Sequence, residues 1–222
     1  MNIVMENTTF ELREIIDSHH GMIWQVSMTQ DLGFAYVQTI SMSSFSQLGT
    51  LVKILNYRSN EAFNGKKVDF FKQFDFLTSP ILGINPPPQR GDNKWKKIGY
   101  LPLLEEDLIS PEFKSEFVKI EGKNADEFIW YVFYGISASA TLEEHFTYEQ
   151  VKHLSFTGFT NLRFMRHRIT MEWMKYLGMD YEKYEIEDSP SYINIEDQKY
   201  FVKCGVNYSE VDQSTRGRAI RL

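Results

Sequence analysis

Residues 22–40 read MIWQVSMTQDLGFAYVQTI, and this stretch decides the fold class. Met22–Met28 and Gly33–Ile40 are rich in bulky side chains that alternate loosely, which is typical of β-strands. Between them, Thr29–Gly33 has the polar and glycine residues of a turn. We therefore predict two antiparallel strands joined as a hairpin.

Further strands are predicted on the C-terminal side of the hairpin. Segments with the residue types of strands lie at Leu51–Tyr57, Lys94–Leu103, Phe117–Ile120 and Phe128–Ile136. Val68–Leu77 fits either a strand or an amphipathic helix, because its phenylalanines match both periods. Asn85–Asp92 contains three consecutive prolines, which remove backbone donors, so we expect an exposed loop there.

The pattern becomes helical towards the C-terminus. Thr147 and Gln150 have the spacing of a capping box, and apolar residues recur at helical spacing from Leu162 to Leu177. Gly178 follows where a left-handed helix terminator is expected. Three further predictions are a short helix at Phe10–Ser18, a strand at Lys199–Val206 and a frayed segment at Asp212–Leu222. Together these elements predict a single α+β domain over residues 1–222, with an antiparallel β-rich core (a curved sheet or small barrel) and C-terminal helices.

The composition favours an acidic protein that binds another protein. Thirty Asp and Glu against 24 Lys and Arg give a formal net charge of −6 and a pI near 5.4. Such a charge repels phosphate, so nucleic acid is not expected as the main partner, whereas a basic protein is attracted. Cys204 is the one cysteine, which excludes an intramolecular disulfide. With no signal peptide and no apolar run of about 20 residues, we expect a cytoplasmic protein without membrane contact.

Motifs of catalysis are missing from the sequence. It has neither a glycine-rich phosphate loop nor a G-x-S-x-G elbow, and His145 in LEEHF has no second histidine one helical turn away. We expect His153 and His167 at a surface or an interface, and Cys204 as a buried, inert thiol. Accordingly, we expect no enzyme, no catalytic residue, no cofactor and no metal.

Two short segments carry a family resemblance. Trp95–Leu103, which reads WKKIGYLPL, and Pro111–Lys114, which reads PEFK, are similar to the signature of the immunity protein 26 family of bacterial polymorphic toxin systems. Other segments in similar places are Gly21–Val26, Gly33–Val37, Trp130–Gly135 and Tyr148–Leu154. The resemblance covers about residues 20–175 and leaves 181–222 as a C-terminal extension. From residue type, we expect Trp95 and Ile98 in the core and Gly99 at a bulge or close backbone approach.

The resemblance implies an immunity protein that binds and neutralises a cognate, basic protein toxin by stoichiometric occlusion. Acids and exposed loops are then the expected contacts: Glu105, Glu106 and Asp107, with Gln89, Arg90 and Asp92 from the proline-rich loop. One alternative is a nucleic-acid or nucleotide-binding module that uses the basic helix 163–175, with Arg163, Arg166, His167, Arg168 and Lys175. Another is a hydrolase whose acids or histidines meet only in three dimensions.

Overall fold

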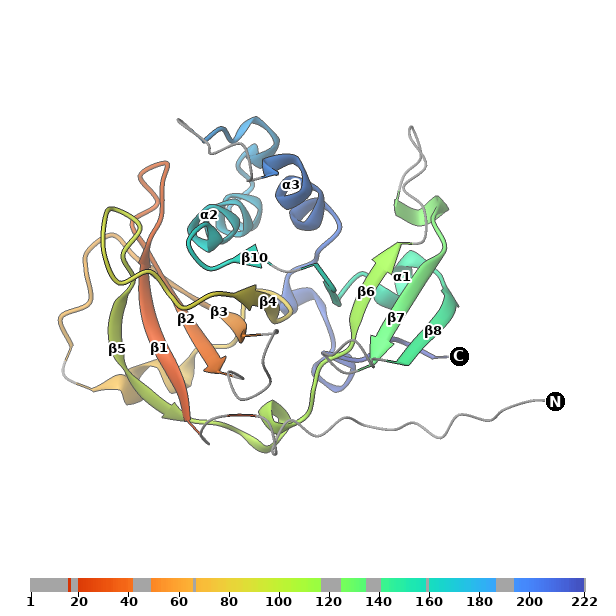
Figure 1. The fold of residues 1–222 in the computed structure, drawn as a ribbon, viewed down its shortest axis with the longest axis horizontal. Helices are drawn as coiled ribbons and strands as arrows, with labels where there is room; N and C mark the ends of the chain where they lie inside the picture. The colour runs from red at the N-terminus through yellow and green to blue at the C-terminus, as the bar shows by residue number, and fades with distance from the viewer. Residues whose placement is uncertain are drawn as a thin grey trace.

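A computed structural model describes residues 16, 20–41, 49–65, 67–116, 125–134, 141–158, 160–186 and 194–221. Two mostly antiparallel sheets lie on either side of C-terminal helices, as Figure 1 shows. The predicted α+β class is therefore confirmed. Apart from Ile16, the expected helix at Phe10–Ser18 lies outside the described residues, and so does the expected strand at Phe117–Ile120.

The larger sheet has six strands in the order β10-β4-β3-β2-β1-β5. Their bounds are β1 His20–Ser27, β2 Phe34–Ser41, β3 Thr50–Ser59, β4 Ile81–Ile84, β5 Lys96–Pro102 and β10 Thr160–Asn161. All neighbours are antiparallel except β4 and β10. The predicted hairpin is confirmed, because β1 pairs with β2 and the Met28 amide donates to the Gly33 carbonyl at 2.8 Å.

Both faces of this sheet are covered. On one face, Val52 and Ile54 belong to a core that includes Trp95, which is 1% exposed and meets Trp24 edge-on. On the other, Leu55 packs in an aromatic cluster built on η2, a 3₁₀-helix at Val68–Gln73. Val68–Leu77, which fitted either a strand or a helix, is thus a short helix followed by an isolated bridge to β3.

Gly99 explains how η2 packs so closely on β5. A Cβ at Gly99 would lie 3.2 Å from the Cβ of Val68, tighter than ordinary van der Waals contact. The pairing of β1 with β5 also shifts register between Ile23 and Trp24, whose partners are Gly99 and Lys97. Both expectations for Gly99 are confirmed, as is the burial of Trp95, while Ile98 is partly buried against the aromatic cluster.

The smaller sheet has four strands in the order β8-β7-β6-β9. Their bounds are β6 Phe113–Glu116, β7 Trp130–Tyr134, β8 Thr141–Phe146 and β9 Ser155–Phe156, with β6 and β9 parallel. Trp130 is fully buried among Phe128, Tyr148 and Phe156 and forms the centre of this core. The 3₁₀-helix η4, Ala125–Glu127, leads into β7, and the Ala125 carbonyl accepts a bond from the Trp130 indole at 2.8 Å.

The C-terminal helices lie between the two sheets, as Figure 1 shows. The longest is α2, Met165–Tyr176, followed by Gly178 in the left-handed region at φ +71°, as predicted. In α1, Tyr148–Val151, the Gln150 side chain accepts from the Thr147 amide at 2.9 Å, so the predicted cap is present. The remaining helices are η3 Glu105–Leu108, η5 Tyr181–Lys183, α3 Ile195–Lys203, η6 Tyr208–Glu210 and η7 Gln213–Thr215. None of the helices in the described part of the chain has the length and apolar character needed to span a membrane.

Two predictions near the C-terminus are wrong. The segment expected to be a strand forms most of α3, which is capped by Asn194, whose side chain accepts from the Asp197 amide. Residues 212–221 are not frayed, because backbone hydrogen bonds hold them along the junction between the two sheets. There the Ile220 amide donates to the Gln150 carbonyl and the Glu112 amide to the Gly217 carbonyl, both at 2.9 Å.

Candidate partner-binding site

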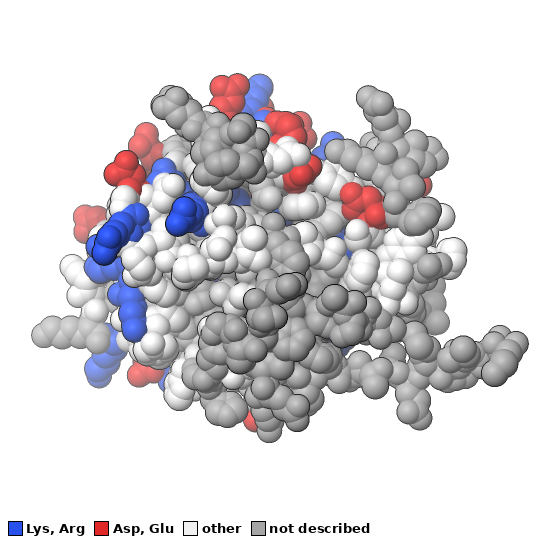
Figure 2. Space-filling model, in the orientation of Figure 1, with Lys and Arg blue, Asp and Glu red and all other residues white. Residues whose placement is uncertain are grey.

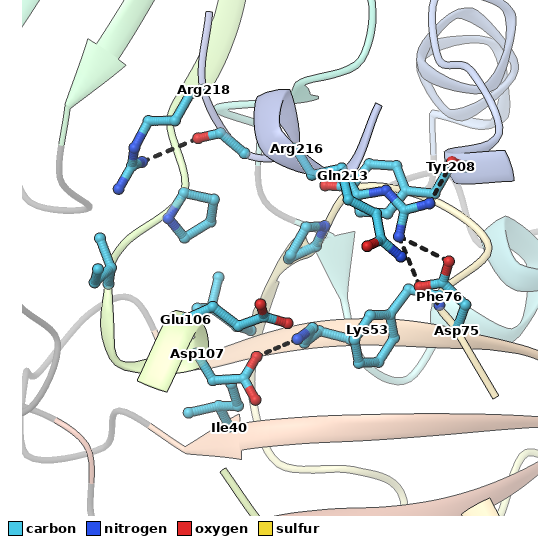
Figure 3. A pocket seen from close by; sticks show the side chains of 15 residues that line it. Ile40, Lys53, Asp75, Phe76, Glu106, Asp107, Tyr208, Gln213, Arg216 and Arg218 are labelled. Atoms are coloured by element: carbon cyan, nitrogen blue, oxygen red, sulfur yellow. Dashed lines mark hydrogen bonds and ion pairs between the residues drawn. The ribbon is translucent and has the colours of Figure 1, made fainter. Parts of the chain in front are cut away.

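A pocket of about 320 Å³ opens where the C-terminal segment crosses the larger sheet. Its walls come from β2, β3, the segment 75–80, η3 with the residues that follow it, and the C-terminal residues 208–218 (Figure 3). These segments are far apart in the sequence, so the pocket depends on the tertiary fold. Charged side chains of both signs line it, and most of them belong to ion pairs.

The first ion pair lies under η3. Lys53, from the middle of β3, donates to one carboxylate oxygen of Asp107, and its ammonium lies 3.7 Å from the centre of the Phe76 ring. The second Asp107 oxygen accepts from the Leu104 amide at 3.0 Å. The side chain of Lys53 is 8% exposed and that of Asp107 is 4% exposed. Asp107 therefore anchors the η3 turn to the sheet, and it does not present its charge to a partner.

The second ion pair ties the C-terminal segment to the sheet. A single guanidinium nitrogen of Arg216 lies 2.7 Å from both carboxylate oxygens of Asp75, and the guanidinium stacks 4.7 Å from the centre of the Tyr208 ring. Burial raises the pKa of Tyr208 to about 12. The Ser79 hydroxyl and the Arg216 guanidinium lower the Tyr208 pKa, and the carboxylates of Asp75 and Glu106, which both line the pocket, raise it.

The residues before Asp107 form an exposed ridge. We call Leu104, Glu105 and Glu106 the η3 ridge; Leu104 is 58% exposed and both glutamates are exposed. Backbone bonds hold the turn, since the Asp107 amide donates to the Leu104 carbonyl at 3.0 Å. Glu106 also lines the pocket, so the ridge forms one side of the pocket entrance.

The three expected contacts in the proline-rich loop lie elsewhere. Gln89, Arg90 and Asp92 are exposed, as expected for this loop, but no residue of the loop lines the pocket. Instead the loop packs on the start of α2, where Arg166 donates to the Asp92 carbonyl at 3.2 Å. The structure therefore brings Glu105, Glu106 and Asp107 together and places the loop residues apart from them.

Most of the basic helix faces inward. Arg168 forms a buried ion pair with Glu172 at 2.7 Å, and Lys175 donates to the carbonyls of Val202 and Gly205. Among the basic residues predicted for this helix, Arg163 is the one that is fully exposed. The positive charges that motivated the nucleic-acid alternative are thus largely engaged inside the protein.

Two histidines and the cysteine are buried. His153 donates from Nε2 to the Arg218 carbonyl, and His167 Nδ1 lies 2.6 Å from the Tyr184 hydroxyl. Neither histidine lies at the surface: His153 is buried in the turn that follows α1, and His167 is on the side of α2 that packs against other elements. Burial lowers the pKa of His153 and brings that of His167 to about 4. The Cys204 thiol is buried as expected, and burial raises its pKa.

The sequence reasoning missed Lys53 and Asp75, the partners of Asp107 and Arg216. One signal was available for Lys53: it is a charged residue inside the apolar strand segment LVKILNY, where a buried lysine needs a partner. Within the described part of the chain, no three His, Cys, Asp or Glu residues are grouped so that they could hold a metal ion. Searches with protein-family models, among curated proteins and among solved structures find no match to this chain.

Proposed function

We propose that this chain is an immunity protein, which binds a basic protein toxin and blocks it by stoichiometric occlusion. The observation that supports this most directly is the η3 ridge. It presents Leu104, Glu105 and Glu106 to solvent on a short turn held from below by the buried Lys53–Asp107 pair.

The ridge has the composition of a small protein-binding surface. An exposed leucine supplies apolar area, and two adjacent glutamates supply negative charge that speeds the approach of a basic partner. Because Asp107 already fixes the turn, little conformational entropy is lost when a partner docks. The net charge of −6 extends the same attraction over the whole molecule.

The family resemblance points to the same part of the molecule. Trp95–Leu103, the segment similar to the immunity protein 26 signature, covers β5 and leads directly into the ridge. Trp95 and Gly99 act within the fold, in the core and at the contact with η2. In this proposal the signature supports the fold, and the ridge that follows it makes the contact.

A capture experiment with charge-reversed bait tests the proposal. Wild-type chain, a ridge variant (Glu105→Lys with Glu106→Lys) and a control variant (Glu182→Lys with Glu185→Lys) are immobilised and exposed to lysate of the source cell. The control makes the same charge change at exposed acids in and after η5. Acidic side chains do gather over the end of the molecule where α2 and α3 lie, as Figure 2 shows, so this control also tests a second acidic surface.

We expect one basic protein to be retained near one-to-one by the wild type and by the control variant, and to be lost from the ridge variant. The captured protein should be toxic when expressed alone, and an equimolar amount of this chain should abolish its activity. Equal retention by the ridge variant would exclude the ridge as the contact surface. Retention of nucleic acid with a steep salt dependence would favour the nucleic-acid alternative instead.

A further inference from the structure

We propose that the pocket beside the η3 ridge receives one long cationic side chain, a lysine or an arginine, of the protein partner. The identity of the partner rests on the proposed function above. The chemistry of the occupant follows from the pocket itself.

The accessible charge of the pocket is negative. The side chain of Asp75 is 44% exposed and Glu106 is an exposed residue, whereas the side chains of Lys53 and Arg216 are only 8% and 16% exposed. The two cations therefore lie beneath the surface, each paired with a carboxylate, while Asp75 and Glu106 are the more exposed charged side chains. Glu106 belongs to neither ion pair, so its charge is available to an incoming cation.

A third cation in the lining, Arg218, does not offset Glu106. Its guanidinium donates to the carbonyl of Ser110 at 2.7 Å and to that of Gly217 at 3.0 Å. Burial lowers the pKa of Arg218, and the carboxylate of Glu112 counters part of this effect. Figure 3 shows the Arg218 guanidinium bonded to a backbone carbonyl on the side of the pocket opposite Asp75.

The rest of the lining suits the stem of a long side chain. Ile40, Leu51, Pro80, Ile109 and Pro111 provide apolar walls. Lysine and arginine bury such stems against apolar surface while the charged end seeks carboxylates. A volume of about 320 Å³ is sufficient for one side chain of this length. The charged end is then placed between Glu106 and Asp75, the two exposed carboxylates of the lining.

Titration with a minimal probe tests the pocket without any toxin. The probe is N-acetyl-L-arginine amide, and its neutral counterpart is N-acetyl-L-citrulline amide, which has nearly the same shape. Binding is followed by ¹H–¹⁵N NMR of the full chain. We expect the arginine probe to shift the amide signals of pocket residues such as Lys53, Asp107 and Gln213, and the citrulline probe to bind at least several-fold more weakly.

Two matched variants test which carboxylate binds the arginine probe. Glu106→Gln removes the carboxylate that lines the pocket, and Glu105→Gln makes the same change at its exposed neighbour outside the lining. Glu106→Gln should weaken arginine-probe binding about fivefold, as expected for loss of a charge-assisted hydrogen bond, and Glu105→Gln should leave it nearly unchanged. Because both positions are exposed, neither variant should alter thermal unfolding, which is measured alongside.

Equal binding of the two probes, equal effects of the two variants, or no shifts at the pocket would each overturn the inference. The result is separate from that of the capture experiment. If the arginine probe binds through Glu106 but no toxin is captured, the pocket inference stands and the immunity function fails. If a toxin is captured through the ridge while the probe leaves the pocket signals unchanged, the function stands and the pocket inference fails.

Discussion

Lys53 of β3 and Lys114 of β6 are buried lysines in the two sheets, and each meets a different set of neighbours. Lys53 meets a carboxylate, that of Asp107, and the face of the Phe76 ring. Lys114 is fully buried, and its hydrogen bonds go to two backbone carbonyls, that of Lys152 at 2.7 Å and that of Cys204 at 2.5 Å. Three aromatic rings surround Lys114 at 5.3–5.6 Å: those of Trp130, Tyr148 and Phe156.

The difference shows two ways to bury an amine. A carboxylate stabilises the ammonium of Lys53, and the pair holds the η3 ridge in place. Around Lys114, burial lowers the pKa to about 7, so the amine is close to neutral under physiological conditions. A neutral amine keeps two N–H donors, which matches the two carbonyls it meets. Lys114 therefore links the C-terminal end of α1 to the C-terminal end of α3 while carrying little charge.

The largest expected effect comes from removing the charge partner of Lys53. Asp107→Asn leaves a buried ammonium without a carboxylate, so we expect a loss of about 3–5 kcal/mol in the free energy of unfolding. Urea denaturation of the variant and the wild type measures this loss. Ridge binding to the captured toxin should also weaken, because asparagine offers one acceptor oxygen to the two donors, Lys53 and the Leu104 amide, that share the Asp107 carboxylate.

The double variant Lys53→Met with Asp107→Leu serves as the control. It removes both charges together, so it should be markedly less destabilised than Asp107→Asn. If the double variant were as unstable as the single one, packing and not charge would account for the loss.

A smaller effect is expected at Lys114, in the pH dependence of stability. In the unfolded chain this lysine stays protonated up to about pH 10, whereas in the folded protein it releases its proton near pH 7. Between pH 7 and 9 the unfolded state thus binds more protons, and stability rises with pH by about 1 kcal/mol per pH unit from this group. In Lys114→Met that contribution should vanish.

Urea denaturation of wild type and Lys114→Met at several values between pH 7 and 9 measures the contribution. The informative quantity is the difference between the two slopes, because it cancels groups common to both proteins. Parallel slopes would mean that Lys114 keeps its proton in the folded state, and the contrast with Lys53 would disappear.

Local signals in the sequence were sufficient for much of the fold. Alternating bulky residues with a polar turn located the β1–β2 hairpin, and apolar spacing followed by Gly178 located α2. These features depend on neighbours within a few residues. Gly99 was also interpretable, because a glycine inside a strand indicates close approach of another segment, here Val68.

Long-range contacts explain where sequence reasoning failed. The β-branched and aromatic residues Tyr200, Phe201 and Val202 favour a strand, yet they lie in α3. The buried amines of Lys114 and Lys175 bind carbonyls at the C-terminal end of that helix, and neither is close to it in sequence. The polar C-terminal segment is similarly held by Arg216 and Asp75, which are 141 positions apart.

For the candidate site, the sequence located three consecutive acids but did not show that one is buried and two are exposed. Glu105, Glu106 and Asp107 are equivalent in composition and consecutive in sequence. Asp107 differs from the two glutamates because it is paired with Lys53, which lies 54 positions earlier in the sequence and belongs to the sheet. No local pattern distinguishes an acid that anchors a turn from two that are presented on it.

The smallest effect is expected where a lysine pairs with an acid at the surface. Lys152 and Glu149 lie 2.6 Å apart, as close as the buried pair of Arg168 and Glu172 at 2.7 Å, but the side chains of Lys152 and Glu149 are 38% and 74% exposed. Glu149→Gln should change the free energy of unfolding by about 0.5 kcal/mol or less, since water already solvates both charges. Urea denaturation at low and high salt measures the change, and Asp107→Asn is the matched acid-to-amide substitution at a buried site. A loss at Glu149 that approached the loss at Asp107 would show that proximity alone determines the strength of these pairs. A large ratio would assign that strength to burial, and the same reasoning underlies our proposal that Glu106, which is exposed and belongs to neither ion pair of the pocket, contacts the cation of a partner.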